Sequence, residues 1–351
     1  MLIMSYEHKP ETDKGDFTID EAVLFRFPEE DLIIIEQDWI KIVQKVREGK
    51  AHEISEGDTL YLGACTKGAT AASVRLQPFS PIKAKQRAYS LKQSYMTYIL
   101  NTYIYGTKRD ENIIKDASEL RQTSFEQTLI DRAEPYIGKT QKELLQIFSI
   151  ESKAKNVNEL ILAKILGAQG KVSKTEEFQK ANIIPKTIRI KSNGTIKENM
   201  SFNIFKFKEL VTQNWEDSEV YDYFSQTKFL FMIFRFNKRE ELIFERIQFW
   251  NMPESDFSAL QSVWESTAAT IRDGVALKYN GKIVTNNLPK QTENEIAHVR
   301  PHSEKSAYRF DDIVIGDIKD ANELPDGRWM TTQSFWLNND YILKQINTVN
   351  T

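Results

Sequence analysis

The stretch that decides the fold is PEEDLIIIEQDWIKIVQKVREG at residues 28–49, because its punctuation recurs as PESDFSALQSVWESTAATIRDG at residues 253–274. Five residue types recur at identical spacing, each 225 positions further on, as in the step from Pro28 to Pro253. They are Pro28, Asp31, Trp39, Arg47 and Gly49, matched by Pro253, Asp256, Trp264, Arg272 and Gly274. An acidic first turn, a final arginine and a following glycine predict a helix from about Glu29 to Arg47.

A second match follows each helix. Tyr89-Ser90-Leu91-Lys92 with Tyr95 corresponds to Phe335-Trp336-Leu337-Asn338 with Tyr341, at an offset of 246 residues. Two matches in the same order favour two copies of one fold, here called the first and second copy, over a helix-entry pattern that arose twice.

The two copies are unequal. A strand is expected ahead of each helix, at Val23–Phe25 and Ile247–Phe249. The second copy also has the long segment Glu126–Lys228 before it, and the first copy lacks a counterpart. We therefore expect two domains, at residues 1–128 and 129–351, the first a partial copy and the second a complete one.

The N-terminal residues Met1–Glu7 are typical of a buried strand, whereas domains more often open with a cap, a turn or a polar tail. A polar loop at residues 8–19 and a second strand at Glu21–Phe27 would complete a hairpin. One interpretation is a short protein with an edge hairpin. The other is a truncated sequence that lacks a segment upstream of Met1.

Composition excludes several classes of protein. Hydrophobic residues make up 40% and charged residues 28%, which is typical of globular proteins rather than disordered chains. The net charge of -3 excludes an overall basic nucleic-acid coat. The single cysteine, Cys65, excludes a disulfide framework and a CxxC zinc site, and it fits a reducing, cytoplasmic location. The longest apolar run, Phe229–Phe234, has the length of a strand rather than a membrane span.

Positive charge is concentrated in one window. From Thr59 to Arg109 there is no Asp or Glu, although these acids make up 50 of the 351 residues. The window carries the basic residues Lys67, Arg75, Lys83, Lys85, Arg87, Lys92, Lys108 and Arg109. Because a polyanion repels carboxylates and attracts cations, this pattern favours a phosphate-backbone surface over a solvated face paired with acids elsewhere. The small residues of Gly63–Ala69 would let the backbone approach a phosphate, but they lack the Walker spacing.

The corresponding part of the second copy is His298–Ser303, with the sequence HVRPHS. Two histidines could bind a metal, but without a nearby third ligand the signal is weak. A rigid Arg-Pro loop that places Arg300 at a base edge or a phosphate is the better interpretation.

Catalytic patterns are lacking. The histidines are His8, His52, His298 and His302. No Gly-x-Ser-x-Gly motif accompanies them, so Ser/His/Asp catalysis finds no support. A phosphodiesterase needs carboxylates around a divalent cation and a lysine near the attacking water. In the strand ending at Lys186, an acid two residues earlier would share its face, but Ile184 occupies that position. We expect a strand that does not support cleavage, followed by a turn at Ser192–Gly194.

These residues resemble the MutH-type DNA endonucleases, and most closely the Sau-three-A type of restriction enzyme, which carries two MutH-like folds in one chain. The resemblance covers nearly the whole chain. Its motifs are Asp38-Trp39, GKAHEISEG at 49–57, ACTKGA at 64–69, AKQRAYSLK at 84–92, WEDS at 215–218, HVRPH at 298–302 and QSFW at 333–336. It implies a restriction-endonuclease-like α/β fold of mixed α+β type, with a mixed sheet flanked by helices in each copy.

The resemblance implies magnesium-dependent cutting of duplex DNA at GATC by the first fold, while a degenerate second fold binds another GATC as an allosteric effector. The family's catalytic set is an early-helix acid, an Asp and a Glu-x-Lys strand. Here Glu177 stands at the Asp position and Lys186 matches the lysine. Ile184 replaces the Glu, and the early-helix acid falls near Ala163, within Glu159–Gly167.

That is the pattern of the non-cutting fold, a pseudo-active site. The catalytic strand of the cutting fold would lie before Met1, so the chain is expected to be inactive alone and to hold no magnesium.

The resemblance also assigns DNA-reading positions. The family's reading loop matches Leu62–Lys67 in the first copy and Val299–Ser303 in the second. The second copy retains Arg300-Pro301 where the first has Gly63-Ala64. The full expected DNA-binding set is Cys65, Thr66, Lys67, Lys83, Lys85, Arg87, Ser90, Lys92, Tyr95, His298, Arg300, Pro301, His302, Ser303, Trp336 and Asn338.

The position that senses adenine methylation in the family holds Ser90 in the first copy and Trp336 in the second. Since serine would not crowd a methyl group as an aromatic ring does, we expect the first copy to tolerate N6-methyladenine.

Three functions stay open. The first is the recognition and effector part of a GATC restriction endonuclease, which binds double-stranded DNA together with an upstream catalytic fragment or as a homodimer on two sites. The second is an active magnesium-dependent endonuclease, alone or complemented by such a fragment. The third is a non-enzymatic module that binds RNA or protein. No membrane partner is expected.

Overall fold

The computed structural model describes the chain except for residues 8, 11–12, 68–72, 108, 153–155, 197 and 349–351. His8, Gly68, Ala69 and Lys108, which the sequence analysis names, lie outside the described residues. The chain forms two compact units. Unit 1 consists of Met1–Ile188, Gln226–Phe234 and Glu241–Asn251, and unit 2 of Arg189–Ser225, Arg235–Glu240 and Met252–Thr351. This division follows packing, whereas the boundary expected at 128/129 separates copies of a repeat, and it stays a prediction.

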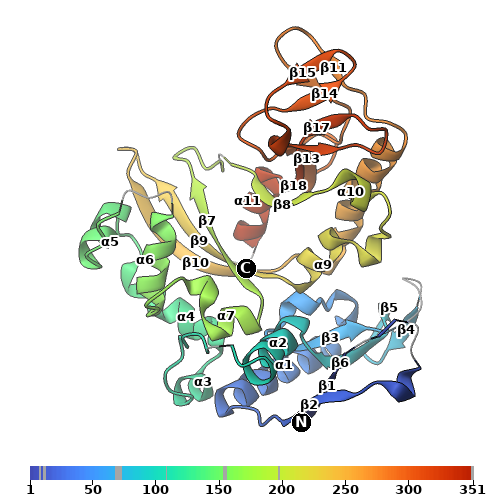
Figure 1. Cartoon of the computed structure of the whole chain (residues 1–351). Helices are drawn as coiled ribbons and strands as arrows, with labels where there is room; N and C mark the ends of the chain where they lie inside the picture. Colours follow the sequence, from blue (N-terminus) through green and yellow to red (C-terminus); the bar gives the residue numbers. More distant parts are fainter. Residues whose placement is uncertain are drawn as a thin grey trace. The chain divides into compact units, whose positions relative to one another are not determined.

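Unit 1 mixes helices with short strands (Figure 1). Its first elements are β1 (Leu2–Tyr6), β2 (Ile19–Leu24), α1 (Glu29–Arg47), β3 (Leu62–Thr66), β4 (Val74–Gln77), β5 (Ser80–Lys85), β6 (Arg87–Leu91) and α2 (Gln93–Ile99), which continues as a π-helix (Leu100–Ile104). The later ones are α3 (Ser118–Gln122), α4 (Phe125–Ala133), α5 (Gln141–Ile147), α6 (Val157–Leu166), α7 (Glu176–Lys180), β7 (Ile183–Ile190), β9 (Lys228–Phe236) and β10 (Leu242–Trp250). The strands β10, β9 and β7 form a sheet in that order, and the apolar run Phe229–Phe234 is buried in β9.

Unit 2 is also mixed (Figure 1). Its elements are β8 (Met200–Phe205), α8 (Phe207–Leu210), α9 (Glu219–Gln226), α10 (Phe257–Arg272), β11 (Lys278–Tyr279), β12 (Val284–Thr285), β13 (Ala297–Pro301), β14 (Tyr308–Phe310), β15 (Ile313–Ile315), β16 (Ala321–Glu323), β17 (Trp329–Thr331), β18 (Gln333–Leu337) and α11 (Asn339–Thr348). One sheet has the order β13-β18-β8 and another the order β15-β14-β17-β16. The predicted mixed α+β class is confirmed.

The helices α1 and α10 end in the same way. α1 ends at Arg47 and α10 ends at Arg272. The glycines that follow, Gly49 and Gly274, have φ of +73° and +95°, in the left-handed region that glycine adopts without strain. The predicted bounds of α1 are confirmed, and the shared glycine marks the end of the helix in both copies.

The repeat extends to side-chain hydrogen bonds. The Tyr95 hydroxyl donates to Asp31 Oδ2 at 2.9 Å. The Tyr341 hydroxyl donates to Asp256 Oδ2 at 2.6 Å. In each copy the landmark aspartate at the start of the long helix therefore binds the tyrosine of the second matching stretch. A shared sequence pattern without shared structure would not reproduce this pair.

The N-terminal strand differs from the expectation. β1 forms and pairs antiparallel with β2. Leu2, Met4 and Tyr6 are exposed, however, and only Ile3 is buried. The prediction of a buried strand was wrong because β1 and β2 form a two-stranded pair among the described residues, which covers few of their side chains.

Candidate nucleic-acid interface

The expected reading loops lie on two antiparallel strand pairs. The first strand pair is β3 with β6, and the second strand pair is β13 with β18. In the first, the carboxylate of Asp38 accepts hydrogen bonds from the backbone N–H groups of Leu60, Tyr61 and Leu62 at 2.9, 2.6 and 2.9 Å. Burial raises the pKa of Asp38, although these three donors oppose the rise. The Asp38-Trp39 motif thus fixes where β3 begins.

A second hairpin, β4 with β5, projects from the acid-free window. Gln77 anchors it, because its side chain accepts from the Ala51 N–H at 3.0 Å and donates to the Ile82 carbonyl at 2.7 Å. A side chain at Gly49 would collide with the Phe79 carbonyl oxygen, 2.5 Å from the position of a Cβ. The Gly49–Gly57 motif therefore supports the turn of this hairpin, which carries the exposed Lys83.

Several residues assigned to DNA binding in the first copy are accessible. Thr66, Lys67 and Lys83 are exposed, while Cys65, Lys85, Arg87 and Ser90 are half-buried. Arg87 donates from Nη1 to the Ala64 carbonyl at 2.7 Å, so this guanidinium bridges β6 and β3. The exposed groups are compatible with contact to a ligand.

Lys92 and Tyr95 do not fit the expected DNA-binding role. Lys92 is 2% exposed, and its ammonium donates to the Thr59 carbonyl at 2.5 Å. Burial, helped by the nearby Lys228, lowers the pKa of Lys92 to about 7. Tyr95 is 0% exposed and bound to Asp31. The structure contradicts both assignments, since neither side chain reaches the surface.

The second strand pair presents a stacked arrangement. The Arg300 guanidinium lies over the Trp336 ring, 4.7 Å from its centroid. The His302 ring lies 5.8 Å from the same tryptophan, and its Nδ1 is 2.9 Å from Ser334 Oγ. Arg300, Pro301 and His302 are all exposed. The Trp336 ring therefore supports an exposed guanidinium, an arrangement suited to flat, acceptor-rich ligands.

Three other residues expected to read DNA in the second copy have internal partners. His298 is buried, with Nδ1 2.6 Å from Asn338 Oδ1, and burial lowers its pKa, so the ring is neutral at pH 7. Asn338 is also buried and donates to the Asn294 carbonyl at 2.7 Å. Ser303, half-buried, donates to the Asp320 carbonyl at 3.3 Å. The structure contradicts direct contact by His298 and Asn338.

The register of the two strand pairs corrects the expected loop alignment. Ser90 faces Gly63, and its counterpart Trp336 faces His298. Arg300 follows His298 by two residues, and Cys65 follows Gly63 by two residues. Arg300-Pro301 therefore corresponds to Cys65-Thr66 and not to Gly63-Ala64. The place of the Arg300–Trp336 stack is taken in the first copy by two small side chains, Cys65 and Ser90.

Known proteins are similar to this chain in sequence. A family model described as the DNA mismatch repair enzyme MutH matches residues 166–262. The chain is also 40% identical over 370 residues to the type II restriction enzyme Sau3AI of Staphylococcus aureus, covering 97% of this chain and 76% of that protein. The chain belongs to the Sau3AI family of restriction enzymes. The resemblance expected from the sequence is confirmed.

The positions assigned to the Sau3AI family's catalytic set lie on α6, which carries the buried Ala163, on α7 and on β7. Both oxygens of the Glu177 carboxylate accept from backbone N–H groups, at 2.9 and 3.0 Å from Ile113 and 2.8 Å from Ile114. Ile184 is half-buried, and the strand expected to end at Lys186 continues to Ile190. Burial lowers the pKa of Lys186. Among the described residues, no cluster of three or more His, Cys, Asp or Glu could hold a metal ion.

Sequence reasoning missed a buried charge cluster next to Glu177. The Lys180 ammonium lies 3.0 Å from both oxygens of Asp31 and 3.1 Å from Glu176. Burial opposes protonation of Lys180, but the two carboxylates raise its pKa overall. Asp31 and Lys180 are far apart in sequence, so no local pattern signals this pair. It ties α1 to α7 within unit 1.

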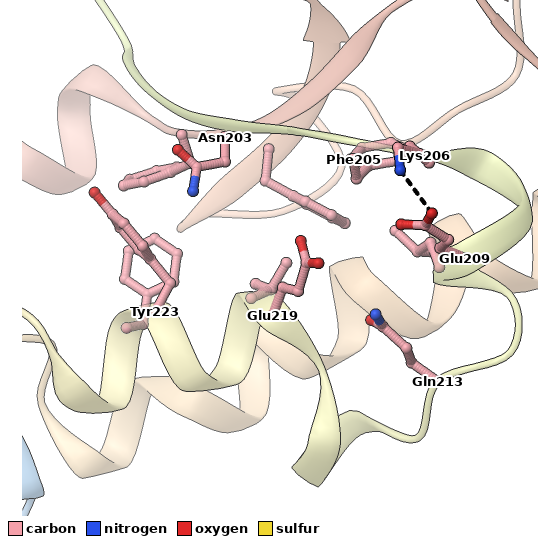
Figure 2. Close-up of a pocket in the computed structure, with 12 residues that line it drawn as sticks. Asn203, Phe205, Lys206, Glu209, Gln213, Glu219 and Tyr223 are labelled. Atoms are coloured by element: carbon pink, nitrogen blue, oxygen red, sulfur yellow. Dashed lines mark hydrogen bonds and ion pairs between the residues drawn. The ribbon is translucent and has the colours of Figure 1, made fainter. Parts of the chain in front are cut away.

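Unit 2 also contains a pocket between β8 and the helices α8 and α9. Figure 2 shows Asn203 and Glu219 turned toward its interior and the ion pair of Lys206 with Glu209, 2.7 Å apart, at one side. Its walls are aromatic, including Phe202 and Phe205. Because two carboxylates line it, the pocket is unsuited to phosphate, and we do not assign it to the interface.

No helix in the described part of the chain has the length and apolar character required to cross a membrane.

Proposed function

We propose that this chain binds duplex DNA sequence-specifically, at GATC, as the recognition and effector part of a Sau3AI-type restriction endonuclease. The observation that carries the proposal is the exposed Arg300, whose guanidinium carbon lies over the Trp336 ring, 4.7 Å from its centroid. An arginine fixed in this way can donate two parallel hydrogen bonds to the O6 and N7 acceptors of a guanine in the major groove. GATC contains one such guanine on each strand.

The first copy supplies a different part of the binding energy. Lys67 and Lys83 are exposed in a window without a single carboxylate. Ammonium groups on such a surface displace counterions from phosphates and bind all duplexes alike. We therefore assign phosphate contact to the first strand pair and its neighbouring hairpin, and base reading to Arg300.

The residues present do not fit the magnesium ion that the family's cutting fold uses. Ile184 offers no oxygen where the Glu of the Glu-x-Lys strand is needed, and Glu177 directs both oxygens to backbone donors. A cation that must be held by carboxylates therefore lacks two of its ligands at this position. We propose that this site does not cut, and we derive no catalytic step through a metal.

The test is a titration of the full chain with labelled duplexes. Duplexes that contain GATC should bind at least tenfold more tightly than a scrambled duplex, with affinity that falls steeply with salt. GATC plasmid incubated with the chain and magnesium should stay intact. Cleavage by the purified chain would favour the alternative of an active endonuclease. Equal binding of all duplexes, or a preference for single-stranded RNA, would favour a non-enzymatic module.

The methylation proposal concerns Ser90 and Trp336. We propose that the site with Ser90 accepts N6-methyladenine because a small side chain leaves room for the methyl group. One equivalent of methylated GATC duplex should then bind the full chain as tightly as unmethylated duplex does. Ser90→Trp should weaken this binding of methylated duplex. Rejection of methylated DNA by the unmodified chain at all sites would overturn this proposal.

A further inference from the structure

The pocket between β8, α8 and α9 lies beside an irregularity in the pairing of β8 with β18. Ser334 of β18 is paired with Ile204 of β8, and Trp336 is paired with Ser201. Two steps along β18 therefore correspond to three steps along β8. An extra residue in one strand of a pair is a β-bulge, which re-aims the side chains of the strand that carries it.

The bulge puts two unlike side chains into one wall of the pocket. Phe202 and Asn203 are successive residues of β8, and in a regular strand such neighbours point to opposite faces of the sheet. Both nevertheless line the pocket, together with Phe335 of β18. Asn203 is turned toward the interior (Figure 2). The bulge therefore brings a polar amide next to an aromatic wall.

The pocket is separate from the nucleic-acid interface. Phe335, which lines the pocket, directly precedes Trp336, which supports Arg300. Successive side chains of a strand point to opposite faces of its sheet. A ligand in the pocket would therefore lie on the other face of the β13-β18-β8 sheet from the Arg300–Trp336 stack, and its binding does not depend on DNA.

The buried part of the pocket is apolar. Its buried lining side chains come from β8, α8, α9 and β18, and they are Phe202, Phe205, Leu210, Phe224 and Phe335. Aromatic rings bury a flat apolar ligand well, and the faces of such rings also attract cations. The floor of the pocket therefore favours a ligand with a flat apolar body.

The polar side chains of the pocket differ in their protein partners. Lys206 is paired with Glu209 at 2.7 Å. Glu219 contributes to the raised pKa of Lys206, but its carboxylate accepts no hydrogen bond and forms no ion pair within the described part of the chain. The side chains of Asn203 and Gln213 likewise have no hydrogen bond to a described residue. One cation and two carboxylates line the pocket, so one negative charge is left without a matching cation.

A ligand that fills the pocket has to satisfy the Glu219 carboxylate, which is turned toward the interior (Figure 2). A neutral apolar ligand would take water from this carboxylate without replacing its hydrogen bonds, which costs free energy. An anion would be repelled. A cation with N–H donors instead forms charge-assisted hydrogen bonds with the carboxylate, which are stronger than neutral ones.

We propose that this pocket binds a small organic cation in which a flat apolar ring carries an ammonium or amidinium group. The cationic group would donate to the Glu219 carboxylate, with the amide oxygens of Asn203 and Gln213 as further acceptors. The ring would pack on the floor beside Phe202 and Phe335.

Three ligands of the same shape and different charge test this proposal on the full chain. They are benzamidinium, benzamide and benzoate, which are a cation, a neutral molecule and an anion. In isothermal titration calorimetry near neutral pH, benzamidinium should bind about tenfold or more tightly than benzamide, and benzoate should not bind. Glu219→Gln keeps the shape of the side chain and removes its charge, so it should weaken benzamidinium binding about tenfold.

Glu216→Gln is the matched control. It removes the same charge from an exposed acid in the turn before α9, outside the pocket, and should leave benzamidinium binding unchanged. Because both glutamates are exposed, both variants should unfold at the temperature of the unmodified chain. Equal losses in the two variants would overturn the proposal, because acidic surface alone would then explain the binding. Equal affinities for the three ligands, or no binding of benzamidinium at millimolar concentration, would overturn it as well.

Discussion

The first and second strand pairs have the same anchors and different surfaces. In the first, Lys92 donates to the Thr59 carbonyl, and at the equivalent positions of the second Asn338 donates to the Asn294 carbonyl. The less buried positions, in contrast, differ: the first copy has the half-buried Cys65 and Ser90 where the second has the stacked Arg300 and Trp336. The comparison teaches that the buried hydrogen bonds of the scaffold are kept in both copies, while the more accessible side chains differ.

The largest expected effect concerns the two landmark aspartates. Asp31→Ala leaves the buried Lys180 with only Glu176, and removing one partner of a buried ion pair costs about 3–5 kcal/mol. Asp256→Ala removes hydrogen bonds from the buried Tyr341 hydroxyl and the half-buried Gln345 amide, and should cost about 1–3 kcal/mol. Urea unfolding of both variants measures the difference. Equal losses of unfolding free energy in the two variants would show that Lys180 and Glu176 add no stability beyond the Asp–Tyr hydrogen bond that both copies share.

The second prediction concerns pH. Burial lowers the pKa of Lys92 to about 7 from the ordinary 10.5, so the unfolded chain binds a proton that the folded chain has released between these values. Stability should therefore rise with pH in this window, by about 1.4 kcal/mol per unit from this group. Lys92→Asn installs the residue of the second copy and should remove this contribution. If the difference in unfolding free energy between the unmodified chain and Lys92→Asn stays constant from about pH 7 to 10, the low pKa of Lys92 is contradicted.

The third prediction separates the two surfaces. Arg300→Ala should weaken binding to a GATC duplex by about 1–3 kcal/mol while scarcely changing binding to a scrambled duplex. Trp336→Ala should produce a smaller loss in the same direction because it only orients the arginine. Cys65→Ala, at the equivalent position of the first copy, is the control and should be neutral. Comparable losses of affinity for the GATC duplex and the scrambled duplex would show that Arg300 contacts phosphate rather than a base.

The smallest effect should come from the exposed lysines. The double variant Lys67→Gln/Lys83→Gln should weaken binding to all duplexes equally and should reduce the salt dependence of log K by about two at most. Lys142→Gln/Lys344→Gln removes two exposed charges outside the acid-free window and serves as the control. If the two double variants have the same affinity for DNA and the same salt dependence, the acid-free window makes no special contribution to DNA binding.

Local signals in the sequence were sufficient for the ends of the long helix α1. Pro28 and the acidic turn after it start α1, and Arg47 with Gly49 ends it, because capping and glycine geometry act over a few residues.

The loop alignment was wrong by two residues. Side chains in a strand alternate with period two, so a shift of two keeps every side chain on its face, and only the pairing register exposes the error.

The site was harder to predict than the elements. Arg300 is exposed, as the predicted contact with DNA requires, whereas Lys92 and Tyr95, which belong to the same predicted set, are buried. Where the chain passes from a strand to a helix, residues that are close in the sequence can differ in burial. Their closeness in the sequence therefore does not predict which of them are exposed. The pairing of Asp31 with Lys180 could not be foreseen, since it depends on which helices pack together.

The amino-acid sequence by itself determined the internal repeat, the ends of its long helices, the concentration of positive charge and the family. These features rest on local backbone preferences and composition, which are properties of neighbouring residues. Only the tertiary structure decided which lysines reach solvent and that Trp336 supports Arg300. Those outcomes depend on contacts between residues far apart in the chain, and burial exists only once such contacts have formed.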